Sequence, residues 1–423
     1  MGCINGAHFD PDAARCAVVV YDYTVLAGTQ GFFHHAKIDR LLSVAARQGL
    51  PVVMYTEGGG GRPGDTDVTT QIAGLNVPTF AAWSALNIGK PRIAVNNGFC
   101  FAGNAALFGA ADIRIATRDS WIGMAGPAMI EGGGLGSYAP TEIGPSGTQC
   151  QNGVIDLLVE DEAAATAMAK RLLWYFQGDV PATTALDQIA LRDVLPQDRR
   201  WSYPVRTIIE TVFDPGSFTE LRRVFGRSVV TGLARLAGKT VGVIASDCQQ
   251  LGGAVDSEAA DKATRFFKFC DRCRIPVISL VDTPGFMVGP DSEAAGAVHR
   301  MSALFEAAAA ASVPILAVFL RKAYGLGAMA LVGGSFAVPH YAISWPTGEF
   351  GGMGLEGAVH LGFRKELEAE TDPERRQALF DKLLAELYEK GKAIEAAAHL
   401  EIDAVIDPAE TRDHLINALR VAS

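Results

Sequence analysis

The stretch LPVVMYTEGGGGR, residues 50–62, and the stretch IPVISLVDTPGF, residues 275–286, decide the fold. Each opens on a proline turn, continues as a short apolar run and ends in a glycine-containing loop. Pro276 follows Pro51 by 276 − 51 = 225 residues. Short apolar runs bounded by turn residues are typical of strands buried in a parallel sheet. The two stretches therefore predict the same strand and loop at two places in one chain.

Three more pairs of landmarks keep nearly the same separation. They are KPRIAV at 90–95 with VPILAV at 313–318 (314 − 91 = 223), AGNA at 102–105 with LGAM at 326–329 (327 − 103 = 224), and Trp121 with Trp345 (345 − 121 = 224). Self-similarity at a constant period is the signature of a repeated structural unit. The chain is predicted to be two copies of one domain.

Each copy has the same expected order of elements: a helix, an apolar strand, a glycine-rich loop, a second helix, a second apolar strand and a second loop. The expected helices are residues 34–48 and 81–88 in copy one, and 257–273 and 296–311 in copy two. Apolar strands that alternate with helices indicate an α/β architecture with a parallel sheet.

The join between the copies is expected at the turn-forming residues 214–217, DPGS. This gives an N-terminal domain of residues 1–215 and a C-terminal domain of residues 216–423. Beyond Gly362 the composition shifts to Glu, Lys, Arg and Ala, which predicts charged helices beside the second core. A length of 423 residues also favours two domains, because single cores stop growing near about 250–300 residues.

The composition excludes several classes of function. The net charge is 37 − 47 = −10, and an acidic surface repels phosphate backbones, so nucleic-acid binding is not expected. The longest apolar window, residues 303–320, contains Glu306 and Pro314 and fits a buried helix followed by a strand better than a membrane span. Seven widely spread cysteines give no disulfide framework, which favours a reducing cytoplasm.

No familiar catalytic or metal-binding pattern is present in the sequence. Cys270 and Cys273 are the only close pair of cysteines, and no second pair or histidine pair accompanies them, so no metal site is expected. Gly238-Lys239-Thr240 resembles the end of a phosphate-binding loop, but a strand follows the lysine instead of preceding the loop. GxSxG and HExxH are both missing.

The informative features are the glycines just after the predicted strands. Glu57 to Arg62 and Asp282 to Phe286 follow the first strand of each copy, and Ala102-Gly103 and Gly327-Ala328 follow the second. Glycine lets the backbone come close to a ligand, and several N–H groups that point to one place stabilise an anion or a developing oxyanion. The repetition of this pattern in both copies predicts two oxyanion-binding loops.

The sequence resembles the carboxyltransferase (beta) component of biotin-dependent acyl-CoA carboxylases, of the acetyl-/propionyl-CoA carboxylase type. The resemblance runs from about residue 17 to about residue 419. The motifs that carry it are DYTVLAG at 22–28, EGGGGR at 57–62, DTPGF at 282–286, RKAYG at 321–325, WPTGE at 345–349, GLEGAV at 354–359 and IDPAETR at 406–412. The resemblance implies two tandem crotonase-like (ClpP/crotonase) ββα-superhelix domains.

The resemblance also implies roles for residues. Ala102-Gly103 would hold the thioester oxygen of the acyl-CoA, and alanine is tolerated there as a backbone donor if its φ stays negative. The second oxyanion pair falls on Gly327-Ala328 and would hold the ureido oxygen of carboxybiotin. Because Leu326 is an extra residue after Tyr324-Gly325, the pair Gly325-Leu326 is an open alternative. The remaining implied contacts are Gly59 and Gly60 beside the thioester, and Gly285, Phe286, Tyr324 and Gly325 beside the biotin.

In the implied reaction, biotin on a separate carrier delivers a carboxyl group to the α carbon of an acyl-CoA, and biotin itself serves as the base. Biotin carboxylase and the carrier are expected as partner subunits, because neither an ATP-binding domain nor a biotin-attachment Met-Lys-Met is in this chain. Homo-oligomers from a dimer to a hexamer are expected. Arg62, Lys90 and Arg92 are candidates for CoA phosphate contacts, although ion pairs at the surface are the simpler interpretation.

Three alternatives to carboxyl transfer stay open. A crotonase-type enoyl-CoA hydratase or isomerase would use two carboxylates as acid and base, and only Glu349 lies near an expected position. A biotin-dependent acyl-CoA decarboxylase subunit would run the same transfer backwards. A non-catalytic scaffold subunit is the third alternative, and the glycine loops present in both copies argue against it. The acyl chain length is not encoded in any motif. A helical segment that relatives have ahead of Gly2 is not in the sequence, which bears on affinity for CoA.

Overall fold

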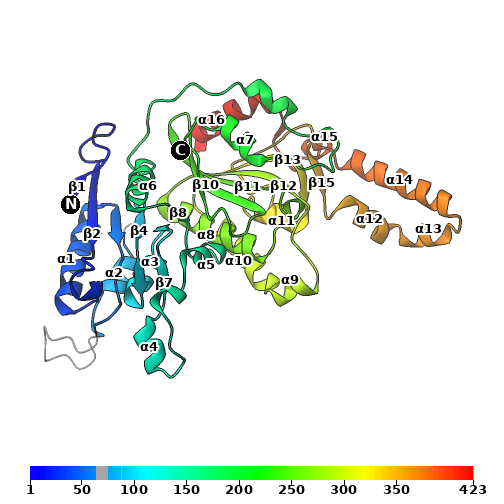
Figure 1. Cartoon of the computed structure of the whole chain (residues 1–423). Coiled ribbons are helices and arrows are strands. Elements are labelled where there is room, and N and C mark those ends of the chain that lie inside the picture. Colours follow the sequence, from blue (N-terminus) through cyan, green and yellow to red (C-terminus); the bar gives the residue numbers. More distant parts are fainter. Residues whose placement is uncertain (63–74, 87, 423) are drawn as a thin grey trace. The chain divides into compact units, whose positions relative to one another are not determined.

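A computed structural model describes residues 1–62, 75–86 and 88–422. It divides into two compact units, Met1–Val180 and Pro181–Ser423. Each unit contains a largely parallel sheet with helices packed on it (Figure 1). This is the duplicated α/β architecture that the sequence predicts.

The sheet of unit 1 has the strand order β1-β2-β3-β4-β6-β8. Its strands are β1 (Gly2–Cys3), β2 (Arg15–Val20), β3 (Val52–Tyr55), β4 (Arg92–Asn96), β6 (Ile113–Thr117) and β8 (Leu157–Val159). All pairs from β2 to β8 are parallel, and only β1 is antiparallel. A second, two-stranded sheet consists of β5 (Phe99–Phe101) and β7 (Trp121–Gly123). The two strands predicted in copy one are therefore confirmed as β3 and β4.

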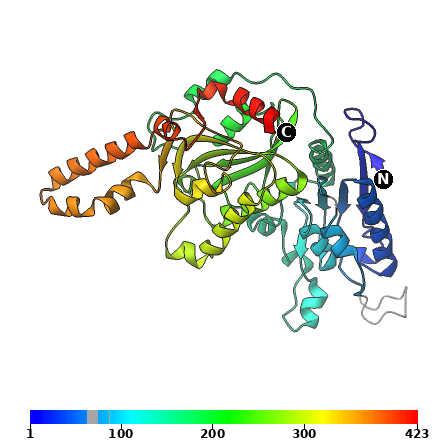
Figure 2. The same ribbon diagram turned by 180° about the vertical axis from the view of Figure 1, so that it is seen from behind.

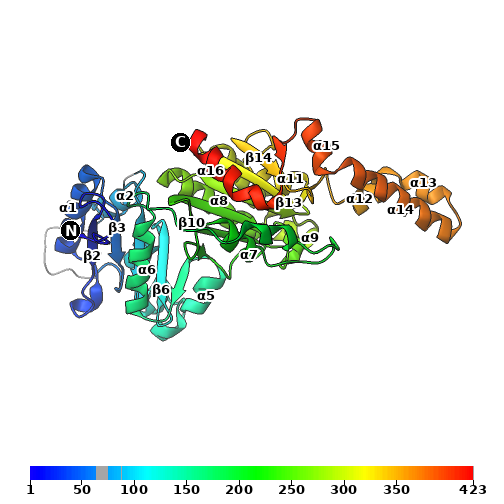
Figure 3. The same ribbon diagram turned by 90° about the horizontal axis from the view of Figure 1, so that it is seen from above.

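Helices cover both faces of the unit 1 sheet. The core on one face includes side chains from α1 (Phe32–Gln48), α2 (Thr79–Ser84), α3 (Gly103–Gly109) and α5 (Ser146–Gln151). On the other face α6 (Glu162–Trp174) packs against β4 and β6 (Figure 3). The predicted helix 34–48 is confirmed as α1. The predicted helix 81–88 is α2, which begins earlier, directly after Pro78; residue 87 lies outside the described residues.

The sheet of unit 2 has the order β16-β14-β13-β12-β11-β10-β9, with β15 beside β13. Its strands are β9 (Thr219–Leu221), β10 (Val229–Leu236), β11 (Lys239–Ser246), β12 (Val277–Thr283), β13 (Ile315–Tyr324), β14 (Tyr341–Ser344), β15 (Glu349–Gly351) and β16 (Ala404–Val405). The pairs of β9 with β10 and of β10 with β11 are antiparallel, and the other pairs are parallel.

The helices of unit 2 also lie on two faces. The largest core cluster joins α7 (Val205–Val212) and α16 (Thr411–Ala422) to one face of the sheet. On the other side α8 (Ser257–Cys273) packs against β10 and against α10 (Ala297–Ala309). The bounds of α8 are those that the apolar periodicity predicts. The described chain of unit 2 also forms α9 (Pro290–Ala294), α11 (Gly325–Ala330) and α15 (Ala393–Ala398).

A helical arm stands away from the sheet of unit 2 (Figures 1 and 2). It consists of α12 (Leu355–Gly362), α13 (Arg364–Ala369) and α14 (Pro373–Lys390). The side chains of α14 are exposed or half-buried along its whole length. The arm is the charged helical region predicted beyond Gly362.

The turn at residues 214–217, where the sequence placed the join, lies inside unit 2. The preceding helix α7 contributes Ile208, Ile209 and Val212 to the unit 2 core. Asp214 also forms a buried ion pair with Arg412 of α16, at 2.5 Å between Oδ1 and Nη2. A segment that contributes both core side chains and a buried ion pair belongs to the unit it stabilises. The assignment of the two halves to acyl-CoA and biotin stays a prediction.

Candidate active site

Two loops of unit 1 meet where β3 and β5 end. The loop after β3 contains Gly60, and the chain after β5 continues through Ala102 into α3. A Cβ placed on Gly60 would lie 2.6 Å from the Ala102 Cβ and 3.4 Å from the Gly103 nitrogen. Real Cβ atoms do not approach other carbons that closely, so only glycine fits at position 60. The backbones of the two loops are therefore in direct contact with each other. We call these two loops, residues 57–61 and 101–104, the first cradle.

The buried side chain of Asn104 fixes the shape of the first cradle. Its Oδ1 accepts a hydrogen bond from the Gly60 N–H at 3.0 Å, and its Nδ2 donates to the Thr56 carbonyl at 3.2 Å. Asn104 has 0% of its surface exposed. The Gly59 N–H is also engaged, because it donates to the Ala27 carbonyl at 3.0 Å. Gly59 and Gly60 thus line the cradle with backbone, while their own N–H groups already have acceptors.

One amide that the first cradle can offer to a ligand is that of Gly103. Gly103 is the first residue of α3, and the first N–H groups of a helix have no acceptor within that helix. The side chain of Gln30 lies against Gly103, in contact with the place that a Cβ would take. Gln30 is buried and donates from Nε2 to the Tyr21 hydroxyl at 3.0 Å. Sequence reasoning did not identify Gln30 or Asn104 as parts of the site.

Ala102 corrects one expectation. The sequence interpretation required a negative φ at this alanine, but the structure has φ 51° and ψ −117°. Only glycine adopts this region without strain, and a non-glycine residue there costs of order 1–3 kcal/mol. The contact with Gly60 and the hydrogen bond from the Ala102 N–H to the Gly123 carbonyl at 2.9 Å hold the strained conformation in place.

We expect the variant Ala102→Gly to raise the free energy of unfolding by about 1 kcal/mol, because glycine removes the strain at positive φ. Carboxyl transfer should change little, since the backbone donors stay where they are. Denaturant unfolding followed by circular dichroism checks the prediction. A variant less stable than the wild type would contradict it.

Unit 2 repeats this arrangement, and we call the result the second cradle (residues 284–286 and 324–327). A Cβ on Gly327 would lie 2.6 Å from the Gly285 carbonyl carbon and 2.7 Å from the Phe286 nitrogen. A Cβ on Gly285 would lie 3.3 Å from the Tyr324 carbonyl oxygen. The Gly285 N–H donates to the Thr283 hydroxyl at 3.1 Å. The loop after β12 and the start of α11 are therefore packed backbone to backbone, as in unit 1.

Backbone conformation indicates which residues of the second cradle correspond to those of the first. Ala102 and Gly325 are the residues that directly follow the strands, and both have positive φ, 51° and 58°. The structural offset is 325 − 102 = 223, one less than the offset between Gly103 and Gly327. This shared positive φ favours Gly325-Leu326, the alternative that the sequence left open, as the counterpart of Ala102-Gly103, and the assignment stays a prediction. Ala328 is completely buried in an apolar core cluster, and Gly327 is the residue that packs against the neighbouring loop.

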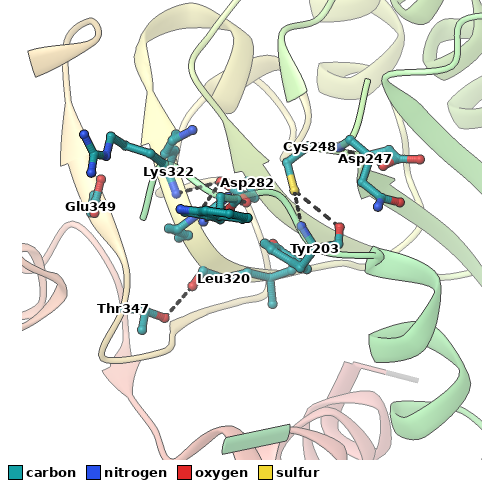
Figure 4. Close-up of polar contacts among 12 residues, drawn as sticks. Tyr203, Asp247, Cys248, Asp282, Leu320, Lys322, Thr347 and Glu349 are labelled. Atoms are coloured by element: carbon teal, nitrogen blue, oxygen red, sulfur yellow. Dashed lines mark hydrogen bonds and ion pairs between the residues drawn. The ribbon is translucent and has the colours of Figure 1, made fainter. Parts of the chain in front are cut away.

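The motifs of unit 2 meet around Asp282, as Figure 4 shows. Arg321 forms a buried ion pair with Asp282, at 3.0 Å between Nη2 and Oδ2, and the Lys322 N–H donates to Asp282 Oδ1 at 3.1 Å. The Thr347 hydroxyl donates to the Leu320 carbonyl at 2.6 Å. These contacts join the strand ends that carry the three motifs.

Glu349 is held by other side chains. The Tyr324 hydroxyl donates to Glu349 Oε2 at 2.8 Å, and Arg199 Nη1 lies 3.8 Å from Oε1. Burial and the neighbouring Glu349 carboxylate raise the pKa of Tyr324, so this phenol stays protonated. In unit 1, the positions after the first cradle carry Ala105 and Ala106. The pair of free carboxylates that hydration requires is therefore not assembled in either cradle.

Glu57 is the ionisable side chain of the first cradle. Burial raises the pKa of its carboxyl, although one oxygen accepts a hydrogen bond from the Asn97 N–H at 2.6 Å. Of the three cations considered for CoA phosphates, Arg92 is buried and paired with Asp112 at 2.8 Å, so it is a structural residue. Arg62 donates to the Thr29 carbonyl at 3.3 Å, and Lys90 is half-buried ahead of β4.

The raised pKa of Glu57 predicts a pH-dependent gain for Glu57→Gln. The unfolded chain ionises Glu57 more readily than the folded chain does, so the charge costs stability once the pH exceeds the unfolded pKa of about 4.3. We expect the variant to be more stable than the wild type at pH 8, with the difference shrinking as the pH falls toward 5. Urea unfolding at several pH values tests this expectation. A constant difference at all pH values would contradict it.

In the described part of the chain, no three His, Cys, Asp or Glu side chains are grouped so that they could hold a metal ion. Among the same residues, no helix is both long enough and apolar enough to cross a membrane.

Residues 12–423 match the family described as the carboxyl transferase domain. The chain belongs to the carboxyl transferase family. Among curated relatives, it is 31% identical over 412 residues to the methylmalonyl-CoA carboxyltransferase 12S subunit of Propionibacterium freudenreichii subsp. shermanii, covering 95% of this chain and 77% of the relative.

Two solved structures are similar to this carboxyltransferase over nearly its whole length. A single-chain, multi-domain long-chain acyl-CoA carboxylase is 51% identical with a TM-score of 0.90, over 98% of this chain and 41% of that chain. This chain thus spans about two fifths of that relative. Transcarboxylase 12S, described as a hexamer with methylmalonyl-CoA bound, is 30% identical with a TM-score of 0.85, over 95% of this chain and 78% of that chain.

These similarities confirm the predicted family, the enzyme class of acyl-CoA carboxyltransferase and the tandem crotonase-like α/β fold. The roles of individual residues rest on the geometry of the cradles. That geometry brings together Ala102, Gly103, Gly59 and Gly60 in unit 1, and Gly285, Phe286, Tyr324, Gly325 and Gly327 in unit 2. The side chain of Ala328 lies in an apolar core cluster, and the role of its backbone N–H stays a prediction.

Proposed function

We propose that this carboxyltransferase moves the carboxyl group of carboxybiotin, presented on a carrier protein, to the α carbon of an acyl-CoA. The observation that carries the proposal is the duplication of the cradle. Gly60 packs on Ala102-Gly103 in unit 1, and Gly285 packs on Tyr324 and Gly327 in unit 2. A transfer between two partners that each develop negative charge on one oxygen needs two such sites.

The first cradle would bind the thioester oxygen of the acyl-CoA. As the α proton leaves, negative charge moves onto this oxygen, and the Gly103 N–H at the start of α3 is the donor nearest to Gly60. A preorganised backbone donor stabilises such a charge, and the loss of one donor costs about 10²–10³ in rate. Gln30 would keep this donor in place because it is buried against Gly103, and the buried Asn104 would hold the Gly60 loop that packs on it.

The second cradle would hold the ureido oxygen of biotin. A Cβ on Gly327 would clash with the backbone of Gly285 and Phe286, so glycine at this position lets the two loops of the cradle pack closely. We assign the donor role to the Gly325-Leu326 backbone, the counterpart of Ala102-Gly103 that the shared positive φ favours. When bound, carboxybiotin supplies the carboxyl group, and the biotin nitrogen supplies the base that removes the α proton. The protein then needs no catalytic carboxylate. This agrees with the position of Glu349, whose carboxylate accepts a hydrogen bond from the Tyr324 hydroxyl.

Partners and assembly follow from the same chemistry. A carrier that brings carboxybiotin and a biotin carboxylase that recharges it are proposed as separate subunits. Transcarboxylase 12S is a hexamer, and a similar homo-oligomer would let unit 1 of one copy work with unit 2 of another. We also propose that the enzyme works in the cytoplasm, which is supported by seven cysteines that are all free thiols.

The test is carboxyl transfer in the reverse direction. The purified chain is given biocytin and either malonyl-CoA or methylmalonyl-CoA, and acetyl-CoA or propionyl-CoA is measured together with carboxybiocytin. Product that depends on biocytin supports the proposal, and the ratio of the two rates reports acyl preference. Water addition to crotonyl-CoA without carboxyl transfer would overturn it in favour of a hydratase, and release of carbon dioxide that does not depend on biocytin would overturn biotin-dependent transfer altogether.

A further inference from the structure

The segment between β11 and α8, residues 247–256, lies against the loop of the second cradle. The Val255 N–H donates to the Gly285 carbonyl at 3.0 Å, and the Met287 N–H donates to the Val255 carbonyl at 2.9 Å. The loop is therefore bound to Val255 by one hydrogen bond at each of two positions. We call residues 247–256 the strap.

The first cradle is held by the same pair of contacts. The residue of unit 1 that matches Val255 is Gln30, with 255 − 30 = 225. The Gln30 N–H donates to the Gly60 carbonyl at 2.7 Å, and the Arg62 N–H donates to the Gln30 carbonyl at 2.8 Å. Gly285 follows Gly60 by the same 285 − 60 = 225 residues. Because both contacts occur in both units, the strap is a regular part of the cradle.

A buried carboxylate anchors the start of the strap. Asp247 has 2% of its surface exposed, and its Oδ2 accepts a hydrogen bond from Nη1 of Arg206 on α7 at 2.6 Å. Its Oδ1 accepts from the Gln249 N–H at 3.1 Å, and its own N–H donates to the Ser228 carbonyl at 2.8 Å. Arg206 also donates from Nε to Glu220 of β9 at 2.9 Å. One guanidinium therefore ties the strap to α7 and to the outer strand of the sheet.

The next residue of the strap, Cys248, contacts the segment that precedes α7. Its Sγ accepts from the Tyr203 N–H at 3.3 Å and donates to the Tyr203 carbonyl at 3.4 Å (Figure 4). The Trp201 carbonyl accepts a hydrogen bond from Nη1 of Arg321 at 2.8 Å, and Arg321 belongs to the ion pair at the end of β12. Residues 201–206 therefore support the loop of the second cradle by two routes, through the strap and through this ion pair.

A buried lysine makes this region sensitive to charge. Lys262 of α8 has 1% of its surface exposed, and burial lowers the pKa of its ammonium group to about 7. The carboxylates of Glu220 and Asp247 oppose this shift, while Arg222 and Arg206 add to it. Without the charge of Asp247, Lys262 and the two arginines would share the single carboxylate of Glu220. Because a buried charge that loses its partner is costly, a neutral amide of the same shape should loosen the strap.

We propose that Asp247 and Arg206 are positioning residues for the second cradle. Their ion pair fixes the start of the strap, and the strap holds the Gly285 carbonyl and with it the loop that packs on α11. Neither side chain has to touch a ligand for this role. The proposal rests on the proposed function, because it takes this loop to be part of the biotin site. Small displacements of a positioned group are enough to matter, since about 1 Å can cost about 10²-fold in rate.

The first test compares Asp247→Asn with Asp214→Asn by hydrogen exchange on the full chain. Asp214 is a matched control, because it is also a buried carboxylate of unit 2 that binds an arginine, and it lies outside the strap and the cradle. We expect the amides of Val255 and Met287 to exchange at least about tenfold faster in Asp247→Asn, because the strap opens locally. In Asp214→Asn they should exchange at nearly the wild-type rate, in conditions that keep both variants folded.

Carboxyl transfer gives the second readout, with biocytin and malonyl-CoA or methylmalonyl-CoA as the substrates. We expect kcat of Asp247→Asn to fall at least about tenfold, with the KM for the acyl-CoA close to the wild-type value. Asp214→Asn should keep its kcat. The variant Arg206→Lys keeps the positive charge but loses the fork that binds two carboxylates, so its kcat should lie between those of the wild type and Asp247→Asn.

Equal exchange at Val255 and Met287 in the two asparagine variants would overturn the proposal, as would a wild-type kcat in Asp247→Asn. If Asp247→Asn does not fold, the same measurements on Arg206→Lys decide, and wild-type values there would overturn it. A wild-type chain without any transfer would refute the proposed function. The exchange result needs no substrate, so in that case it alone decides whether Asp247 positions the loop.

Discussion

The variant Gly327→Val is expected to lose carboxyl transfer by a factor of about 10²–10³ in kcat, the usual effect of displacing an oxyanion donor. The first atom of the valine side chain would lie 2.6 Å from the Gly285 carbonyl carbon and 2.7 Å from the Phe286 nitrogen. Both are backbone atoms on a strand end, so neither can turn away as a flexible side chain would. The loop after β12 and the start of α11 must separate, and the donors of the second cradle move with them.

The control for this variant is Gly357→Val in α12, where the space around the glycine is open. It adds the same side chain to the same unit and should keep nearly full kcat. Near-native melting of both variants is expected, with at most about 1–3 kcal/mol lost by overpacking at Gly327. If unit 2 serves biotin, the KM for acyl-CoA should stay close to the wild-type value. A Gly327→Val enzyme with more than half of the wild-type kcat would contradict the prediction.

The duplication and most helices and strands could be predicted from the sequence because they depend on regular spacing. The helix 257–273 matches α8 at both ends, since its apolar residues recur at helical steps and Asp256 caps its first turn. The strands after Pro51 and Pro276 are short, apolar and bounded by turns, which leaves little choice of assignment. Such features are local, so one stretch of sequence is enough to define them.

The register of the second cradle could not be predicted in the same way. The sequence aligned Gly103 with Gly327 because both are glycines after a strand, whereas the two residues that directly follow the strands and share a positive φ are Ala102 and Gly325. An alanine at positive φ gives no signal in a sequence, because the cost of its conformation is met by contacts elsewhere. For the register between the two cradles, the identity of a residue was therefore a poorer guide than its backbone conformation.

Contacts between distant segments account for the other differences. The turn at residues 214–217 lies within unit 2, where Asp214 pairs with Arg412, 198 residues further along the chain. The side chain of Gln30 reaches the first cradle from a distant part of the chain, and the contact of Asn104 with Gly60 joins residues that are 44 positions apart. A polar residue at a position that otherwise carries buried apolar side chains, such as Asn104 in α3, is the one sequence signal that could have identified the cradle's support.

Asn104 provides the second large effect that we expect. In the variant Asn104→Ala, the Gly60 N–H loses its acceptor and the carbonyls of Thr56 and Glu57 lose their donor. A buried donor left without a partner costs about 1–3 kcal/mol of stability. The loop that Asn104 holds is also the wall of the first cradle, so we expect kcat to fall by at least about tenfold as well. Denaturant unfolding and steady-state transfer kinetics measure the two effects separately.

The control is Gln177→Ala, a second buried amide of unit 1 that lies outside the cradle. Gln177 donates to the Ile4 carbonyl at 2.9 Å and accepts from Asn5 at 2.8 Å, so its loss should lower stability by a similar amount. It should leave kcat unchanged, because neither partner lies in the first cradle. If Asn104 were only a stability residue, both variants would keep their kcat at a temperature where both are folded. A fall in kcat confined to Asn104→Ala therefore assigns it a positioning role, since the pinned loop places the Gly103 donor.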